Sequence, residues 1–107
     1  MTRPTHAVLY CRSAQGSARS LEEQEERCKR KAFEEGAETT ATIIDPGPAH
    51  GGMDRPSVLE LRRLVRAGKI DLVVVDTPDR LTKRIGDIRA LAQEVSRAGA
   101  RLVFLSP

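Results

Sequence analysis

The chain has 107 residues, of which 39% are hydrophobic and 31% are charged, and its net charge at pH 7 is +3. This length and composition predict one globular domain over residues 1–107 and argue against a disordered chain. No apolar run approaches the roughly 20 residues of a membrane-spanning helix, and the start of the chain lacks the features of a secretory signal. We therefore expect a cytoplasmic protein without a membrane partner.

The excess of arginine and lysine permits an anionic partner. With one tyrosine, two phenylalanines and no tryptophan, the chain offers little surface for base stacking, so contact with nucleic acid should be mainly to phosphate. Cys11 and Cys28 are too far apart for a Cys-x-x-Cys pair, which predicts two buried free thiols and no metal site. Walker-type and Gly-x-Gly-x-x-Gly loops are absent, so no nucleotide cofactor is expected.

Four short apolar segments predict strands, at residues 6–11, 39–44, 70–75 and 101–105. The third segment ends in three consecutive valines and then changes abruptly to Asp76 and a run of ionisable side chains. An unbroken apolar run of β-branched residues is typical of a strand that is buried on both faces, as in a parallel sheet.

Segments with helical periodicity lie between these strands. Residues 21–35 predict a helix with a capping box of Ser20 and Glu23 at its start. Further helices are expected from Pro56 to Gly68 and over residues 85–98. The side chains expected to face the core are Leu21, Gln24, Cys28 and Ala32 in the first helix, Val58, Leu61, Leu64 and Val65 in the second, and Ile85, Ile88, Leu91, Ala92 and Val95 in the third.

Strands and helices alternate along the chain, which predicts right-handed crossovers and a three-layer α/β/α fold with a mainly parallel four-stranded sheet. Loops that follow parallel strands lie at one edge of the sheet, where open α/β folds bind their ligands. Three polar segments should therefore meet there, at residues 12–15, 45–55 and 76–84.

This edge is expected to collect cations around one hydroxyl and one carboxyl group. The residues are Arg12, Arg55, Arg80, Lys83 and Arg84 as cations, with Ser13 and Asp79. A guanidinium group binds two phosphate oxygens at once and stabilises the negative charge that develops on them, so this set of residues suits phosphoryl transfer. Ser13 would attack phosphorus, and Asp79 would act as general acid or base. In the structural alternative, Asp79 and Arg80 form a local ion pair in a turn.

Several short motifs are informative as a set, and they extend over nearly the whole chain. They are Tyr10-x-Arg12, Ser20-Leu-Glu-Glu-Gln24 followed by Cys28, Asp45, Asp54-Arg55-Pro56, residues 68–75 and Asp79-Arg80-Leu81. In order and spacing they resemble the catalytic domain of the serine recombinases, the resolvase/invertase family that includes phage integrases. The resemblance implies a resolvase-like fold and site-specific DNA recombination through a phosphoseryl-DNA intermediate, without a cofactor or an essential metal.

The resemblance also implies roles for individual residues. Three arginines match the phosphate-binding set of the family: Arg12, Arg55 and Arg80. Asp79 matches the acid beside them, and Lys83, followed by Arg84, occupies a position where the family usually has arginine, so both are expected at DNA phosphate. The implied partner is the DNA backbone. The implied assembly is a homodimer or tetramer of a longer chain, which adds a dimerisation helix and a DNA-binding domain that residues 1–107 do not contain.

The position of the nucleophile departs from the family pattern. The family serine would fall at Ala14, whereas this chain has Ser13 one residue earlier. A step of one residue in an extended backbone turns the side chain to the opposite face, so Ser13 can serve only if the loop bulges. Three hypotheses remain: an active recombinase domain, a catalytically silent DNA-associated or oligomerising regulator, and a flavodoxin-like module for a small phosphate ligand.

Overall fold

The secondary structure follows the alternating order that the sequence predicts. A computed structural model of the chain describes residues 5–47 and 53–107. Its elements are β1 (Thr5–Arg12), α1 (Ala18–Glu34), β2 (Ala37–Asp45), α2 (Pro56–Arg66), β3 (Leu72–Val75), the 3₁₀ helix η1 (Pro78–Arg80), α3 (Ile85–Arg97) and β4 (Arg101–Phe104). The strands form a sheet in the order β2-β1-β3-β4, and each neighbouring pair is parallel. The predicted α/β fold class is confirmed.

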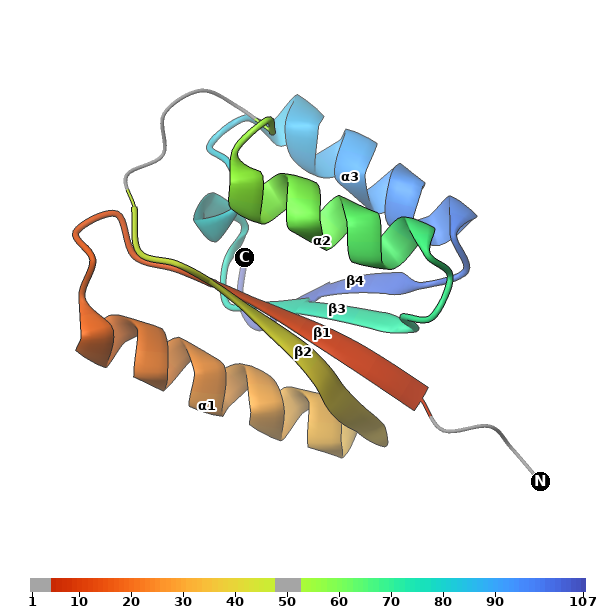
Figure 1. The fold of residues 1–107 in the computed structure, drawn as a ribbon, viewed down its shortest axis with the longest axis horizontal. Helices are drawn as coiled ribbons and strands as arrows, with labels where there is room; N and C mark the ends of the chain where they lie inside the picture. Colours follow the sequence, from red (N-terminus) through yellow and green to blue (C-terminus); the bar gives the residue numbers. More distant parts are fainter. Residues whose placement is uncertain (1–4, 48–52) are drawn as a thin grey trace.

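Helices cover both faces of the sheet, with α1 on one side and α2 and α3 on the other (Figure 1). Successive residues of a strand point to opposite faces, so β1 contributes to two separate cores. Ala7 and Leu9 lie in one core with Cys28 of α1. Val8 and Tyr10 lie in the other, with side chains of α2 and α3. Every residue of β3 is buried, as its unbroken apolar run predicts.

The start of α1 corrects the sequence prediction. The helix begins at Ala18 and its N-cap is Ser17, whose Oγ accepts a hydrogen bond from the N–H of Ser20 at 3.1 Å. Ser20 therefore lies in the first turn rather than at the cap. Both serines suit an N-cap, and the spacing of Ser20 and Glu23 favoured the wrong one. The buried residues of α1 are those predicted, namely Leu21, Gln24, Cys28 and Ala32.

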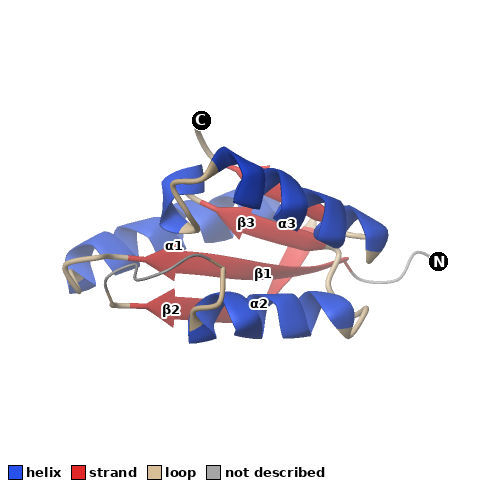
Figure 2. Ribbon diagram, turned by 90° about the horizontal axis from the view of Figure 1, so that it is seen from above, coloured by secondary structure: helices blue, strands red, loops and turns tan. Residues whose placement is uncertain are grey.

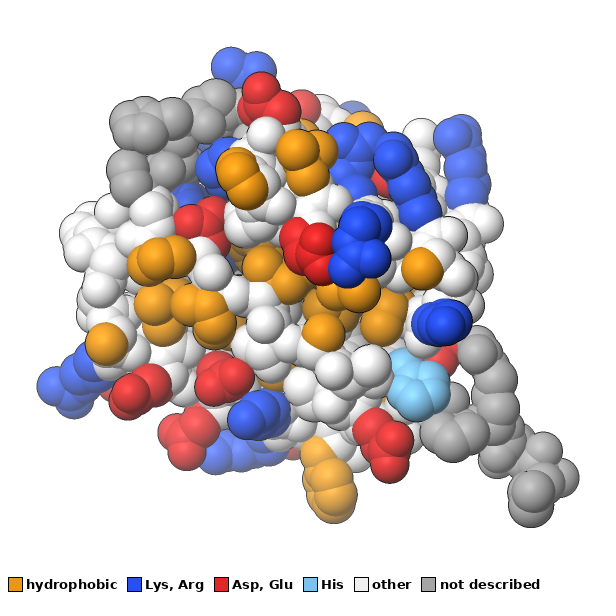
Figure 3. Space-filling view, viewed as in Figure 1, with side chains coloured by type: hydrophobic (Ala, Val, Ile, Leu, Met, Phe, Trp, Pro, Cys, Tyr) orange, Lys and Arg blue, Asp and Glu red, His pale blue; other side chains and the backbone are white. Residues whose placement is uncertain are grey.

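One side chain predicted for the core of α3 lies on the surface instead. Ile85 is 71% exposed and is the first residue of the helix. Exposure falls along the helix, through the partly buried Ile88 to the buried Leu91 and Val95. On the face shown in Figure 3, charged side chains of both signs cover the upper and lower parts of the molecule, and hydrophobic atoms show between them.

The carboxyl ends of the strands share one edge of the sheet. Figure 2 shows the arrowheads of β1, β2 and β3 pointing the same way, toward the loops that follow them. The predicted polar segment at residues 45–55 is described only in part, because residues 48–52 lie outside the described residues. Among the described helices, none combines the length and apolar character needed to cross a bilayer.

Candidate active site

A pocket of about 490 Å³ opens at this carboxyl edge. Its lining comes from the loop after β1, the residue before α2 and the segment after β3. The lining residues are Arg12, Ala14, Gln15, Arg55, Asp79, Arg80, Thr82, Lys83 and Arg84. The fold thus brings together all five cations that the sequence placed at this edge, with Asp79 among them. Ser13 does not line the pocket.

Arg12 is the last residue of β1, and α1 fixes its main chain. The N–H of Arg12 donates to Oε1 of Gln24 at 3.0 Å, and its carbonyl accepts from Nε2 of the same side chain at 2.9 Å. Gln24 is fully buried, so its amide satisfies both main-chain groups where the strand ends. The side chain of Arg12 is 6% exposed, and its Nε donates to the carbonyl of Gly47 at 3.4 Å.

Arg55, immediately before α2, connects three segments at the back of the pocket. Its Nη2 donates to the hydroxyl of Tyr10 at 3.1 Å and to the carbonyl of Leu81 at 2.6 Å. Its Nε lies 3.6 Å from Oδ2 of Asp45. Because Arg55 is 7% exposed and bound to the ends of β1 and β2 and to the residue after η1, its guanidinium is held in one place.

Asp45, the last residue of β2, supplies the negative charge opposite Arg55. It accepts hydrogen bonds from Oγ of Ser57 at 2.5 Å and from the N–H of Gly47 at 3.0 Å, and the Tyr10 hydroxyl lies 3.4 Å away. Partial burial acts to raise the pKa of Asp45, but these hydrogen bonds and the nearby arginines outweigh it and hold the pKa below its ordinary value. The carboxylate is therefore charged at neutral pH.

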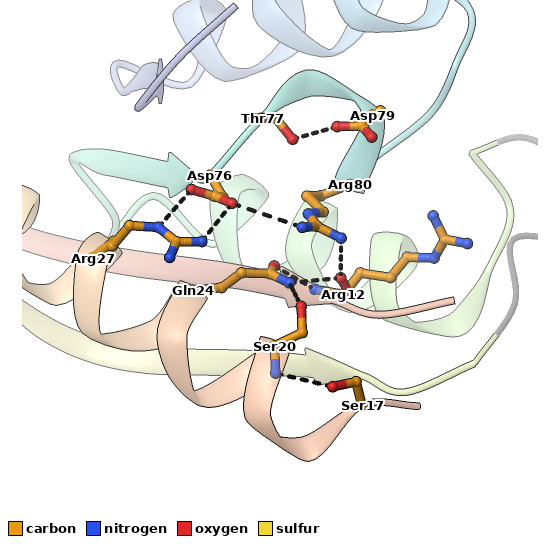
Figure 4. A network of polar contacts seen from close by, with 9 residues as sticks. All are labelled: Arg12, Ser17, Ser20, Gln24, Arg27, Asp76, Thr77, Asp79 and Arg80. Atoms are coloured by element: carbon orange, nitrogen blue, oxygen red, sulfur yellow. Dashed lines mark hydrogen bonds and ion pairs between the residues drawn. The ribbon is translucent and has the colours of Figure 1, made fainter. Parts of the chain in front are cut away.

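Arg80 lies in η1, beside the end of β1 (Figure 4). Its Nη1 donates to the carbonyl of Arg12 at 3.1 Å, and its Nη2 lies 3.9 Å from Oδ2 of Asp76. The guanidinium is thus placed between a main-chain carbonyl and a buried carboxylate. The neighbouring Asp79 is exposed and accepts a hydrogen bond from Oγ1 of Thr77, so the ion pair that Arg80 makes is with Asp76.

Ser13 and Ala14 point in different directions. The N–H of Ser13 donates to the carbonyl of Asp45 at 3.0 Å, which continues the pairing of β1 with β2 by one residue. The side chain of Ser13 is 2% exposed, and its Oγ accepts a hydrogen bond from the N–H of Ser17 at 3.0 Å. Ala14 is exposed and lines the pocket. The position that faces the pocket is therefore an alanine.

Lys83 and Arg84 form the outer rim of the pocket, and both are exposed. Thr82 anchors the backbone of this segment to the start of α3. Its Oγ1 accepts from the N–H of Arg84 at 3.1 Å and donates to Oδ2 of Asp87 at 3.2 Å. The backbone of this segment is thus anchored, while its two cationic side chains reach solvent.

Several polar residues in and around the pocket were not among the predicted site residues, including Gln15 in the lining. Asp76 could have been found, because it directly follows the buried strand β3 at the carboxyl edge. Arg27 lies three positions after Gln24, on the same side of α1. No pattern in the sequence marks Ser57 or Thr82, since their hydrogen bonds depend on the fold.

The arrangement suits a phosphate anion. Arginine pairs with two phosphate oxygens at once and keeps its charge at any physiological pH, and lysine adds a point charge. Five cations and one carboxylate line the pocket among the described residues, so a bound phosphate anion would meet a net positive site. Over residues 5–47 and 53–107, no three His, Cys, Asp or Glu side chains form a group that could hold a metal ion.

The sequence from residue 7 to residue 107 matches the family model "Resolvase, N terminal domain". The chain therefore belongs to the resolvase family, and residues 7–107 correspond to the N-terminal domain of its members. The resemblance seen in the short motifs is confirmed. No curated protein sequence matches the chain.

Solved structures show the same fold. The C-terminal catalytic domain of ISC1926 TnpA, an IS607-like serine recombinase, superposes with a TM-score of 0.83 at 23% identity, over 95% of this chain and 69% of that one. The N-terminal catalytic domain of TP901-1 integrase superposes with a TM-score of 0.84 at 23% identity, over 94% of this chain and 78% of that one. A resolvase family site-specific recombinase from Streptococcus pneumoniae superposes with a TM-score of 0.79 at 22% identity, over 94% of this chain and 72% of that one.

Proposed function

We propose that the pocket binds a phosphate of the DNA backbone during site-specific recombination. The observation that carries this proposal is the convergence of five cationic side chains, from three separate segments, on one pocket. They are Arg12, Arg55, Arg80, Lys83 and Arg84. Membership of the resolvase family supports DNA as the source of the phosphate, over the alternative of a flavodoxin-like module for a small phosphate ligand.

In this proposal the domain works within a larger assembly. A homodimer or tetramer of a full-length protein would bring several such pockets to one DNA site, as the family resemblance implies. A DNA substrate is also consistent with the cytoplasmic location expected from the sequence.

Strand cleavage would require a hydroxyl that faces the bound phosphate. A serine oxygen would form a bond to phosphorus while the bond to the leaving deoxyribose oxygen breaks, and that oxygen would take up a proton. The arginines would stabilise the charge that develops on phosphorus oxygens, and Asp79, which lines the pocket, is the candidate for proton transfer.

The second hypothesis, a domain that binds DNA phosphate without cutting it, has a specific observation in its favour. Ala14 offers no hydroxyl at the pocket-facing position, and the hydroxyl of Ser13 is engaged by the N–H of Ser17. A nucleophile displaced by as little as an ångström costs on the order of a hundredfold in rate. We therefore propose that this chain, as it stands, binds DNA and does not cleave it through Ser13.

A matched pair of lysine variants tests the proposed binding site. Lys83 lines the pocket, whereas Lys69 is exposed just before β3, at the opposite end of the sheet. Binding of a labelled DNA duplex, followed by fluorescence anisotropy at several salt concentrations, should weaken in Lys83→Gln, and the slope of log K against log salt should fall by about one. Lys69→Gln should bind like the wild type. Equal effects of the two variants, or salt-independent binding, would refute the proposal.

A further inference from the structure

The ion pair between Arg27 and Asp76 lies behind the pocket and lines no part of it. Asp76 follows β3 directly and is 7% exposed. Arg27 of α1 binds both carboxylate oxygens, with Nε 3.1 Å from Oδ1 and Nη2 2.9 Å from Oδ2. The hydrogen bond to Asp76 is the main reason why the pKa of Arg27 is raised. Such bidentate pairing fixes the orientation of a carboxylate as well as its position.

We propose that Arg27 and Asp76 are positioning residues for Arg80, and that they set how tightly the pocket binds phosphate. This inference rests on the proposed function. Oδ2 of Asp76 is shared, because it lies 2.9 Å from Nη2 of Arg27 and 3.9 Å from Nη2 of Arg80. Figure 4 shows the three side chains in line, with the carbonyl of Arg12 on the far side of Arg80.

Arg80 needs such support because its side chain is long and 30% exposed. An arginine side chain loses considerable rotamer freedom when it is fixed, and a site that fixes it beforehand avoids that cost on binding. The carbonyl of Arg12 accepts a hydrogen bond from Nη1 of Arg80. The carboxylate of Asp76 provides the second anchor, and Arg27 holds that carboxylate against α1.

The sign of the effect separates positioning from simple charge. A carboxylate behind a phosphate site repels the phosphate, so removing the charge of Asp76 should strengthen DNA binding if Coulomb forces alone act. If Asp76 positions Arg80, the same change should weaken binding. The two explanations therefore predict opposite results.

The test uses Asp76→Asn, which keeps the size of the side chain and removes its charge. Binding of a labelled DNA duplex at low salt should weaken about threefold, the value of one partly exposed ion pair, because Asp76 and Arg80 lie 3.9 Å apart. Glu26→Gln is the matched control, because Glu26 is exposed on α1 beside Arg27 and the change in charge is the same. Glu26→Gln should bind DNA at least as tightly as the wild type. Tighter binding by Asp76→Asn would overturn the proposal.

A double-mutant cycle with Arg80→Ala shows whether Asp76 acts through Arg80. In the Arg80→Ala background, Asp76→Asn should weaken binding no further, whereas a full additional loss would refute positioning. If Arg80→Ala itself leaves DNA binding unchanged, the proposed function fails rather than this inference. Should Asp76→Asn not fold, as judged by circular dichroism, Arg27→Gln replaces it, since the Arg27 side chain is 45% exposed. Arg30→Gln, which removes the same charge from an exposed site of α1, is then the control, and Arg27→Gln should weaken binding more than Arg30→Gln does. Unchanged binding in a folded Arg27→Gln variant would then reject the proposal.

Discussion

The hydroxyl of Ser13 accepts a hydrogen bond from the main-chain N–H of Ser17 at 3.0 Å. Ser17 is itself the N-cap of α1 and accepts from the N–H of Ser20 at 3.1 Å. Two serine hydroxyls thus bind amide groups at the start of one helix, where such groups lack partners within the helix. Ser13 has a structural role here, which explains why its side chain is turned away from the pocket.

Removing this hydroxyl should destabilise the domain. Ser13→Ala leaves the Ser17 amide without its acceptor, and we expect the free energy of unfolding to fall by about 1 kcal/mol. Urea denaturation followed by circular dichroism measures the change. Ser106→Ala, at an exposed site after β4, is the control and should unfold like the wild type. An unchanged midpoint in Ser13→Ala would contradict the structural role.

Adding a hydroxyl at the next position should have a different effect. Ala14→Ser places an oxygen on the pocket lining, where it can reach a phosphate held by the arginines. We expect this variant, and not the wild type, to form a covalent adduct with plasmid DNA, visible as a protein–DNA band that survives SDS. The opposite result, adducts of the wild type that Ser13→Ala abolishes, would mean that the loop rearranges to use Ser13.

Asp45 should make stability depend on acid pH. Its pKa in the folded protein lies below the ordinary value of 3.8, so its contribution is fully present above about pH 3.8. The contribution is lost as the pH falls from there through the folded pKa. Asp45→Asn should cost on the order of 2 kcal/mol near neutral pH. The difference in Tm between wild type and variant should narrow below pH 3.8, and a difference that stays constant down to about pH 2 would refute this assignment.

Cys11 and Cys28 should be unreactive in the folded protein. Both are free and 0% exposed, as the sequence predicted. A hydrogen bond from Cys28 to Cys11 is the main cause that raises the pKa of Cys28 and lowers the pKa of Cys11. We expect alkylation, read by mass spectrometry, to be slow under native conditions and fast in urea. Rapid labelling of either thiol in the native state would contradict the buried arrangement.

The sequence was sufficient to predict how the pocket is assembled. Apolar runs and helical periodicity gave the alternating elements, and parallel topology then required Arg12, Arg55 and Arg80 to share one edge. No knowledge of side-chain contacts was needed for this step, because the direction of the strands decides where their loops lie.

Contacts that depend on the packing of α1 against the sheet could not be predicted. The pairing of Arg27 with Asp76 joins a helix to a loop, and it requires the rotation of α1 about its axis to be known. The choice of Ser17 over Ser20 as N-cap depends likewise on the turn that follows β1, where Gly16 adopts a φ of +67°. A local pattern cannot distinguish two serines that both suit the cap.

The place of β1 inside the sheet has a consequence for synthesis. β1 is made first, yet it lies between β2 and β3, and Tyr10 pairs with Val75. A nascent chain that ends before residue 72 can pair only one side of β1, and it also lacks Arg80. Pairing β3 with β1 closes the long stretch of chain between Tyr10 and Val75, and such long-range pairing is slow. The capacity to hold a phosphate therefore arises late, after β3 has left the ribosome and joined the sheet.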